Sequence, residues 1–217
     1  MLSHDEIKAV YDKLGAAQDT VSFFEAPALA LLRQHAALER ARAVFEFGCG
    51  TGSFAATLLA DDLPAAACYV GLDQSTTMVQ LAAARLTRFG PRAIVLQSDG
   101  TITLPASTGG VDRFVCNYVL DLLPEREIVA LLAEAHRVLQ PGGLLCLTTI
   151  THGTTPVSRV VMQGWQLLYW LQPERLGGCR PIAVHSLLDH NQWTVRYQTI
   201  SITRGLASEV VVAARVA

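Results

Sequence analysis

Three glycines at alternate positions follow a short apolar run in the first quarter of the chain. Gly48, Gly50 and Gly52 come directly after Val44–Phe47, which is apolar except for Glu46. Glycine adopts a positive φ without strain and lets a ligand approach the main chain without meeting a Cβ. Three glycines in five positions, after a predicted strand and before a short apolar helix, predict a loop that cradles a ligand.

The spacing of these glycines separates two kinds of cofactor. A dinucleotide fingerprint has the pattern G-x-G-x-x-G and places a pyrophosphate at the N-terminus of the next helix. Here the third glycine comes one residue early, and Ser53 occupies the position where that pattern has glycine. Glu46, two residues before Gly48, would repel a pyrophosphate, whereas it suits a ligand that carries an amine or a sulfonium. A Gly-rich turn that binds nothing is the alternative.

Short apolar runs alternate with helical segments along most of the chain. We expect strands at 44–47, 67–72, 93–97, 113–119 and 144–150, helices at 53–60, 75–89, 124–139 and 156–171, and a hairpin of residues 193–202 and 208–216. Strands of near-continuous apolar content, joined through helices, predict a parallel sheet that is covered on both faces. The chain is therefore predicted to be one α/β domain that ends in an antiparallel hairpin.

The composition excludes several classes of protein. Hydrophobic residues make up 51% and charged residues 17% of the 217 residues, so a large core is expected and disorder is not. The net charge is −2, with no cluster of Lys or Arg, which argues against a nucleic-acid partner. The longest apolar stretch, 160–171, is interrupted by Gln163 and Gln166 and is too short to span a bilayer.

The cysteines and the first residues favour a cytoplasmic protein. Five cysteines are scattered without C-x-x-C spacing, which predicts reduced thiols in the core rather than disulfides or a zinc site. The segment Met1–Lys8 is polar and acidic, unlike a secretory signal. We expect no bound metal.

Several motifs occur in the order that characterises a known family. After the glycine loop come Asp73, Asp99, the segment 112–123, and Leu139-Gln140-Pro141-Gly142-Gly143. In this order they resemble the class I S-adenosylmethionine-dependent methyltransferases. The last motif is similar to the L-x-P-G-G that precedes the fifth strand in small-molecule enzymes of the ubiquinone and menaquinone biosynthesis type.

This resemblance covers residues 40–150 and implies a fold, a cofactor and a set of binding residues. The implied fold is Rossmann-like: a doubly wound, mostly parallel seven-stranded sheet with helices on both faces and the C-terminal antiparallel hairpin. The single domain, 1–217, would consist of a helical lid (1–40), a cofactor-binding core (41–150), a substrate-side helical segment (151–192) and the hairpin (193–217). The cofactor would be S-adenosyl-L-methionine, with S-adenosyl-L-homocysteine as product. The residues expected to bind it are Glu46, Gly48, Cys49, Gly50, Gly52, Asp73, Gln74, Asp99, Gly100, Asn117 and Tyr118.

The polar residues at three strand ends have expected roles in this site. Asp73 lies 21 residues after Gly52 (73 minus 52), where a carboxylate can accept hydrogen bonds from two ribose hydroxyls. Asp99 can accept from an adenine amino group, although Ser-Asp-Gly is also ordinary turn chemistry. Asn117 and Tyr118 would contact the methionine part of the cofactor or the acceptor, with Tyr118 as a plain core aromatic an equal alternative.

The acceptor side carries weaker signals. Tyr11, Trp165, Tyr169 and Arg180 are candidates for acceptor contacts, and the wide apolar face of helix 156–171 suits an apolar or aromatic small molecule unless it simply packs on the sheet. His152 and His185 are candidate general bases, needed only if the acceptor is not already a good nucleophile.

The predicted function is direct in-line methyl transfer to such a small-molecule acceptor. The alternatives are an NAD-type oxidoreductase on a related sheet and a non-catalytic S-adenosylmethionine-binding protein.

Overall fold

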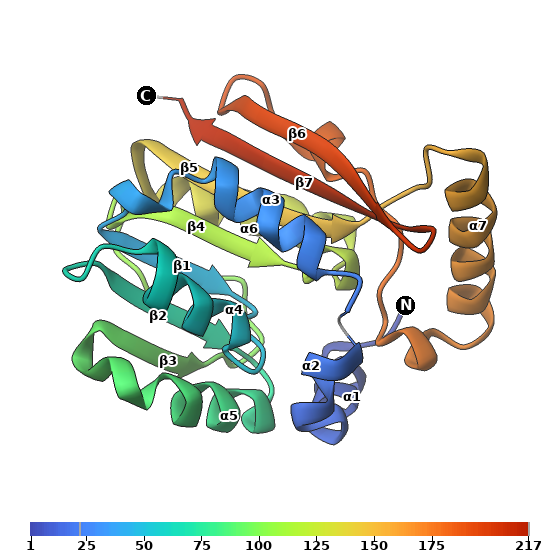
Figure 1. Cartoon of the computed structure of the whole chain (residues 1–217), viewed down its shortest axis with the longest axis horizontal. Coiled ribbons are helices and arrows are strands. Elements are labelled where there is room, and N and C mark those ends of the chain that lie inside the picture. Colours follow the sequence, from blue (N-terminus) through green and yellow to red (C-terminus); the bar gives the residue numbers. More distant parts are fainter. Residues whose placement is uncertain (22, 217) are drawn as a thin grey trace.

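A seven-stranded sheet forms the centre of the protein. The computed structural model describes residues 1–21 and 23–216, and its sheet has the strand order β3-β2-β1-β4-β5-β7-β6 (Figure 1). The strands are β1 (Ala43–Phe47), β2 (Cys68–Asp73), β3 (Ala93–Gln97), β4 (Val111–Asn117), β5 (Leu139–Ile150), β6 (Trp193–Thr203) and β7 (Leu206–Arg215). The first five strands are parallel and β7 and β6 are antiparallel, so the expected fold is confirmed.

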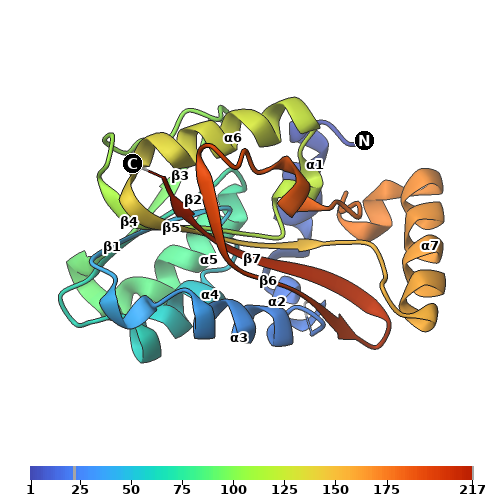
Figure 2. The same ribbon diagram turned by 90° about the horizontal axis from the view of Figure 1, so that it is seen from above.

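Helices cover both faces of the sheet. The helices are α1 (His4–Leu14), α2 (Gln18–Val21), α3 (Ala26–His35), α4 (Ser53–Thr57), α5 (Thr76–Leu86), α6 (Glu125–Val138) and α7 (Pro156–Leu171). Alternation along β1 divides the core, because successive strand residues point to opposite faces. Phe45 packs with α6 in one cluster, and Val44 packs with α3, α4 and α5 in the other. Figure 2 shows α6 on one side of the sheet and α3 and α4 on the other.

Helix α7 differs from the other long helices because one apolar side of it is uncovered. It stands beside the end of the sheet (Figure 1), and only Ser158 and Met162 are buried. Trp170 is 83% exposed, and the side chains of Val157, Val160, Leu167 and Leu171 are exposed as well. The opposite side contacts the end of the sheet, where Met162 packs with Ala207 of β7, so the expectation that the helix packs on the sheet holds for that side alone.

The strand ends differ from the predicted bounds for local reasons. The fourth strand stops at Asn117 because Tyr118 has a φ of 54°, a left-handed conformation that no strand continues. The fifth strand begins earlier than predicted, at Leu139, because Leu139 already pairs with Val111 of β4. The pairing resumes at Leu144 opposite Arg113, and the Pro-Gly-Gly turn forms the irregular part between them. The hairpin turn lies at Arg204 and Gly205, and both residues have a positive φ. Two-residue turns that match the twist of the flanking strands require this conformation.

The third glycine of the loop holds two helices close together. Gly52 has a φ of 73°, and a Cβ built there would lie 3.0 Å from both Cα and Cβ of Ala82 in α5. Gly50 has a φ of 52°, but nothing lies within 4 Å of the equivalent Cβ position. Gly52 therefore permits the close packing of α4 on α5, which sets the position of the loop between β1 and α4.

We predict that Gly52→Ala destabilises the protein more than Gly50→Ala does. Both substitutions impose backbone strain, but only the first adds a steric clash, so we expect losses of about 2–4 and about 1 kcal/mol in the free energy of unfolding. Urea denaturation followed by circular dichroism measures both. Equal losses would mean that the contact with Ala82 does not limit the packing of the helices.

Candidate active site

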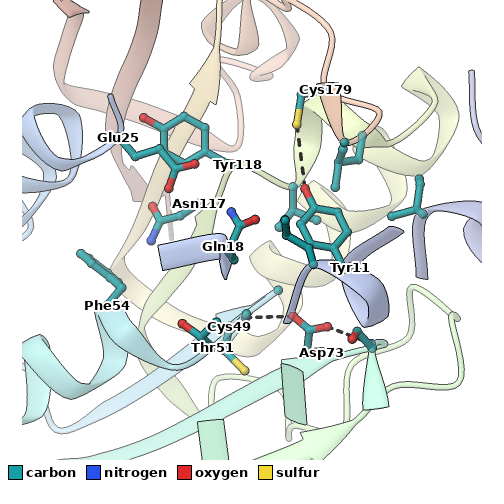
Figure 3. Close-up of a pocket in the computed structure, with 18 of the residues that line it drawn as sticks. Tyr11, Gln18, Glu25, Cys49, Thr51, Phe54, Asp73, Asn117, Tyr118 and Cys179 are labelled. Atoms are coloured by element: carbon teal, nitrogen blue, oxygen red, sulfur yellow. Dashed lines mark hydrogen bonds between the residues drawn. The ribbon is translucent and has the colours of Figure 1, made fainter. Parts of the chain in front are cut away.

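A cavity of about 710 Å³ opens at the carboxyl ends of the parallel strands (Figure 3). Its volume lies within the range of small-molecule sites, and parallel strands bring their carboxyl ends to one edge of the sheet. Residues after β1, β2, β3 and β4 line it, and so do residues of α1, α2 and the start of α3. Four loops and the N-terminal segment thus meet in one hollow.

The glycine loop and Asp73 form one end of the cavity. The carboxylate of Asp73 accepts hydrogen bonds from the backbone amides of Gly50 and Ser75, each at 2.9 Å (Figure 3). Gly48, Cys49, Gly50, Asp73 and Gln74 all line the cavity. Each carboxylate oxygen can accept more than one hydrogen bond, so Asp73 keeps acceptor capacity toward a ligand. Burial raises the pKa of this carboxyl above its usual value.

Glu46 lies at the floor of the same end. Its side chain is buried and accepts hydrogen bonds from the hydroxyl of Tyr69 at 2.5 Å and from Nδ2 of Asn117 at 3.4 Å. Burial raises its pKa to about 8, against the effect of both hydrogen bonds. A buried carboxyl with this pKa gains from a cation placed beside it, because an opposite charge favours the ionised form.

The third and fourth strand ends contribute differently from each other. Asp99 does not line the cavity, because its carboxylate turns back to accept from the amide (2.9 Å) and hydroxyl (2.7 Å) of Thr101. Gly100 and Thr101 do line it. Asn117 and Tyr118 line it as well, and the left-handed φ of Tyr118 directs its ring to the sheet end, where its hydroxyl donates to Ser208 at 2.9 Å.

The N-terminal segment is attached over the cavity by two aspartates that the sequence did not reveal. Asp12 of α1 accepts from the hydroxyl of Ser75 at 2.6 Å, at the N-terminus of α5. Asp19 of α2 accepts from Arg85 and from the hydroxyl of Thr51, both at 2.6 Å. These contacts hold α1 and α2 beside the glycine loop, so residues such as Tyr11 reach the cavity.

Apolar and aromatic side chains line the end of the cavity away from Asp73. Phe24 contacts the rings of Tyr118 (5.9 Å between centroids) and Trp165 (6.3 Å), both edge to face. Leu122 and Ile150 add aliphatic wall on this side. Such an end suits an apolar or aromatic group better than a charged one.

Two acidic residues at this end were missed by the sequence analysis. Glu25, at the start of α3, is half-buried and lines the cavity, and burial followed by repulsion from Asp121 and Asp19 raises its pKa to about 8. Asp121 is fully buried behind the wall, and neither of its carboxyl oxygens has a hydrogen-bond partner among the described residues. Glu25 belongs to no motif, and Asp121 lies inside the 112–123 segment without a signal of its own, so only the folded chain reveals their place beside the cavity.

Other candidates from the sequence lie outside the cavity lining. His152 is exposed, and His185 is bonded through Nδ1 to Glu209 at 2.6 Å. Arg180 donates to the carbonyl of Leu123 at 2.6 Å. Of the predicted site residues, Tyr11 and Trp165 line the cavity. Those that do not line it are His152, His185, Arg180, Tyr169, Asp99 and Gly52.

Within 1–21 and 23–216, no helix combines the length and the apolarity needed to cross a bilayer. Over the same ranges, no three His, Cys, Asp or Glu side chains gather as ligands of a metal ion.

Comparison with known proteins assigns a family to the central part of the chain. A family model described as a methyltransferase domain matches residues 44–143, from the first strand to the Pro-Gly-Gly turn. Residues 44–143 thus match a methyltransferase domain. The glycine loop and Asp73 both lie within this domain.

Curated relatives match over part of their length. Demethylmenaquinone methyltransferase of Lactococcus lactis is 28% identical over 114 residues, which are 52% of this chain and 44% of that protein. Malonyl-[acyl-carrier protein] O-methyltransferase of Laribacter hongkongensis is 33% identical over 168 residues, 75% of this chain and 54% of that protein. The tRNA N(3)-methylcytidine methyltransferase Mettl2 of Drosophila melanogaster is 29% identical over 126 residues, which are 57% of this chain and 39% of that protein. The chain thus spans about half the length of these relatives or less.

Solved structures share the fold beyond the methyltransferase domain. The N-methyltransferase NodS of Bradyrhizobium japonicum, solved with S-adenosyl-L-homocysteine, superposes with a TM-score of 0.65 at 16% identity. The match covers 89% of this chain and 88% of NodS. The match therefore extends well beyond residues 44–143, which the family model covers.

We predict that the carboxyl of Glu46 makes the stability of the ligand-free protein depend on pH. Its pKa is about 8 in the fold and 4.5 as the unperturbed value, so between these pH values the folded state binds a proton that the unfolded state has released. The stabilisation is complete below pH 4.5 and is lost as the pH rises to about 8. Compared with Glu46→Gln, the wild type should lose up to about 1.4 kcal/mol of unfolding free energy per pH unit in this range.

Urea denaturation at several pH values measures this difference. Glu39→Gln, at a side chain that is 68% exposed, is the matched control and should keep the wild-type slope. Parallel stability curves for wild type and Glu46→Gln would contradict the raised pKa.

Proposed function

We propose that this protein transfers the methyl group of S-adenosylmethionine to a small acceptor that is apolar or aromatic. The observation that carries the proposal is one cavity in which the glycine loop and Asp73 form one end and Phe24, Tyr118 and Trp165 form the other. A donor at the first end and an apolar acceptor at the second would meet inside a single hollow.

The charge of the cavity fits a cationic cofactor. Among its lining acids, Glu25 and Glu46 have pKa values raised to about 8. Of the lysines and arginines there, Lys8 and Arg33 are paired with Asp12 and Asp62, which do not line the cavity, and Arg175 remains. Acidic side chains therefore outweigh uncommitted basic ones, and a sulfonium or ammonium group would relieve the cost of burying them.

We assign the parts of the cofactor to the residues that line the cavity. Asp73 would accept from the ribose hydroxyls, and the backbone of 100–101, rather than the Asp99 carboxylate, would lie against the adenine. Glu46 and Asn117 would face the methionine part. The remaining cofactor contacts are proposed for Gly48, Cys49, Gly50, Gln74 and Tyr118.

Positioning and exclusion of water are the main tasks of the chain in this reaction. The sulfonium of the cofactor supplies an electrophilic methyl group when it is bound. Side chains of α1 and α2 cover the glycine loop, and Tyr11 and Trp165 wall the acceptor end. Holding two reactants in line in such a site contributes on the order of 7–11 kcal/mol to lowering the barrier.

Calorimetry with three ligands tests the proposed cofactor. S-adenosylmethionine and S-adenosylhomocysteine should bind to the purified protein, and NAD should not. Apolar phenols and quinols are then offered as acceptors, with tRNA as the comparison. S-adenosylhomocysteine should be formed with the small molecules and not with tRNA. Binding of NAD in place of S-adenosylhomocysteine, or turnover of tRNA alone, would refute the proposal.

We predict that Asp73→Asn weakens S-adenosylhomocysteine binding by roughly 10- to 150-fold. A hydrogen bond to a charged group contributes about 1.5–3 kcal/mol, and the substitution removes the charge while keeping the size of the side chain. Asp99→Asn is the matched control, because the Asp99 carboxylate bonds to Thr101 outside the cavity lining, and it should bind within about twofold of wild type. Equal losses in the two variants would assign the ribose contact elsewhere.

A further inference from the structure

Glu25 occupies a distinctive place in the cavity. It is the residue before α3, and its neighbour Phe24 packs against Tyr118 and Trp165 at the apolar end. In Figure 3 its carboxyl lies next to Tyr118 and Asn117, across the cavity from Asp73. Glu25 is therefore an acidic side chain of the cavity lining that lies beside its apolar end.

The carboxyl of Glu25 is not committed to a structural contact. Among the described residues it has no hydrogen-bond or ion-pair partner, in contrast to Asp73, Glu46 and Asp19. A buried carboxyl without a partner is costly, so a half-buried one that faces a cavity is a candidate for contact with a ligand. Its backbone carbonyl accepts from the amide of Leu29 at 3.0 Å, which fixes the start of the helix that carries it.

We propose that Glu25 is the general base of the reaction and that the acceptor is a neutral hydroxyl compound, a phenol or quinol with an apolar body. This inference rests on the proposed function and names its acceptor class. A carboxylate acceptor would be repelled by Glu25 and by the neighbouring Asp121, whereas a hydroxyl can donate its hydrogen bond to Glu25.

The proton and the electrons balance without a further reactant. A lone pair of the hydroxyl oxygen forms the new bond to the methyl carbon, and the carbon–sulfur bond breaks with its electron pair staying on sulfur. The hydroxyl proton moves to the carboxylate of Glu25, which later releases it to water. The products are the methyl ether and neutral S-adenosylhomocysteine.

The groups that surround Glu25 set the pH at which it can accept a proton. Tyr11 of α1, Asp19 of α2, Tyr118 and Asp121 after β4, and Cys179 after α7 all interact electrostatically with it. Burial and the two aspartates raise its pKa to about 8, and Arg180 acts on Asp121 in the opposite direction. A cofactor cation in the cavity would lower the pKa of Glu25 again and ionise the base when the donor is in place.

The test compares Glu25→Gln and Glu25→Asp with wild type on the best acceptor of the phenol and quinol panel. Glu25→Gln should lower kcat by about 10²–10⁴-fold, and Glu25→Asp should recover part of the loss. S-adenosylhomocysteine affinity, measured by calorimetry, should stay within about threefold in both variants. Glu39→Gln, at the exposed surface, is the control for the charge change.

The pH profile and the acidity of the acceptor separate a base from a structural role. In wild type the rate should rise with pH and level off at or below about pH 8, because the base must be ionised. In Glu25→Gln the rate should follow the ionisation of the acceptor itself at higher pH. With a nitro-substituted analogue, already ionised at neutral pH, the loss in Glu25→Gln should shrink to less than tenfold.

Each contrary outcome has one meaning. If S-adenosylhomocysteine binds but no phenol or quinol is methylated, the acceptor class is wrong. If Glu25→Gln keeps near-wild-type turnover, or loses the same factor on both acceptors, Glu25 is not the base. If neither S-adenosylmethionine nor S-adenosylhomocysteine binds to wild type, the proposed function fails before this inference is reached.

Discussion

The carboxylate of Asp73 connects the two loops on which the site depends. It accepts from the amide of Gly50 after β1 and from the amide of Ser75 before α5. The carbonyl of Leu72, one residue earlier, accepts from the amides of Gly48 and Cys49 at 2.7 and 3.1 Å. The end of β2 thus holds the glycine loop in place, and the side chain of Ser75 in turn bonds to Asp12 of the N-terminal segment. The glycine loop, the end of β2 and the N-terminal segment thus share one continuous set of hydrogen bonds.

The electrostatics of the cavity show a conflict between stability and the proposed chemistry. Glu46, Glu25 and Asp121 lie in or beside a hollow of low polarity, and burial raises the pKa of each carboxyl. A core that served stability alone would pair these acids or replace them with apolar groups. Shifted carboxyls grouped at a cavity are instead typical of sites that bind a charged ligand or move a proton. The proposed cationic donor supplies the missing charge, and the proposed acceptor supplies the proton.

The chain order of the fold could be predicted because its signals are local. Apolar runs, glycines and Pro-Gly-Gly turns reflect the backbone needs of neighbouring residues, so the strands, α5 and α6 were located to within a few residues. The exceptions arose where tertiary contacts prevailed. The pairing of Leu139 with Val111 extended β5. Helix α7 has the predicted bounds, but only one side of it is covered by the rest of the fold.

By itself, the sequence determined the α/β fold, the glycine loop and the acid at Asp73, because each depends on residue types at fixed spacing within one strand–loop–helix unit. Only the tertiary structure decided which side chains share the cavity. Asp12, Asp19 and Glu25 lie in or next to helices with no motif, whereas His152, which follows β5, and His185, which lies between α7 and β6, are outside the cavity lining. The physical reason is that the directions of side chains, and the packing of helices α1, α2 and α3 on the rest of the fold, depend on contacts between residues far apart in the chain. No local sequence pattern contains that information.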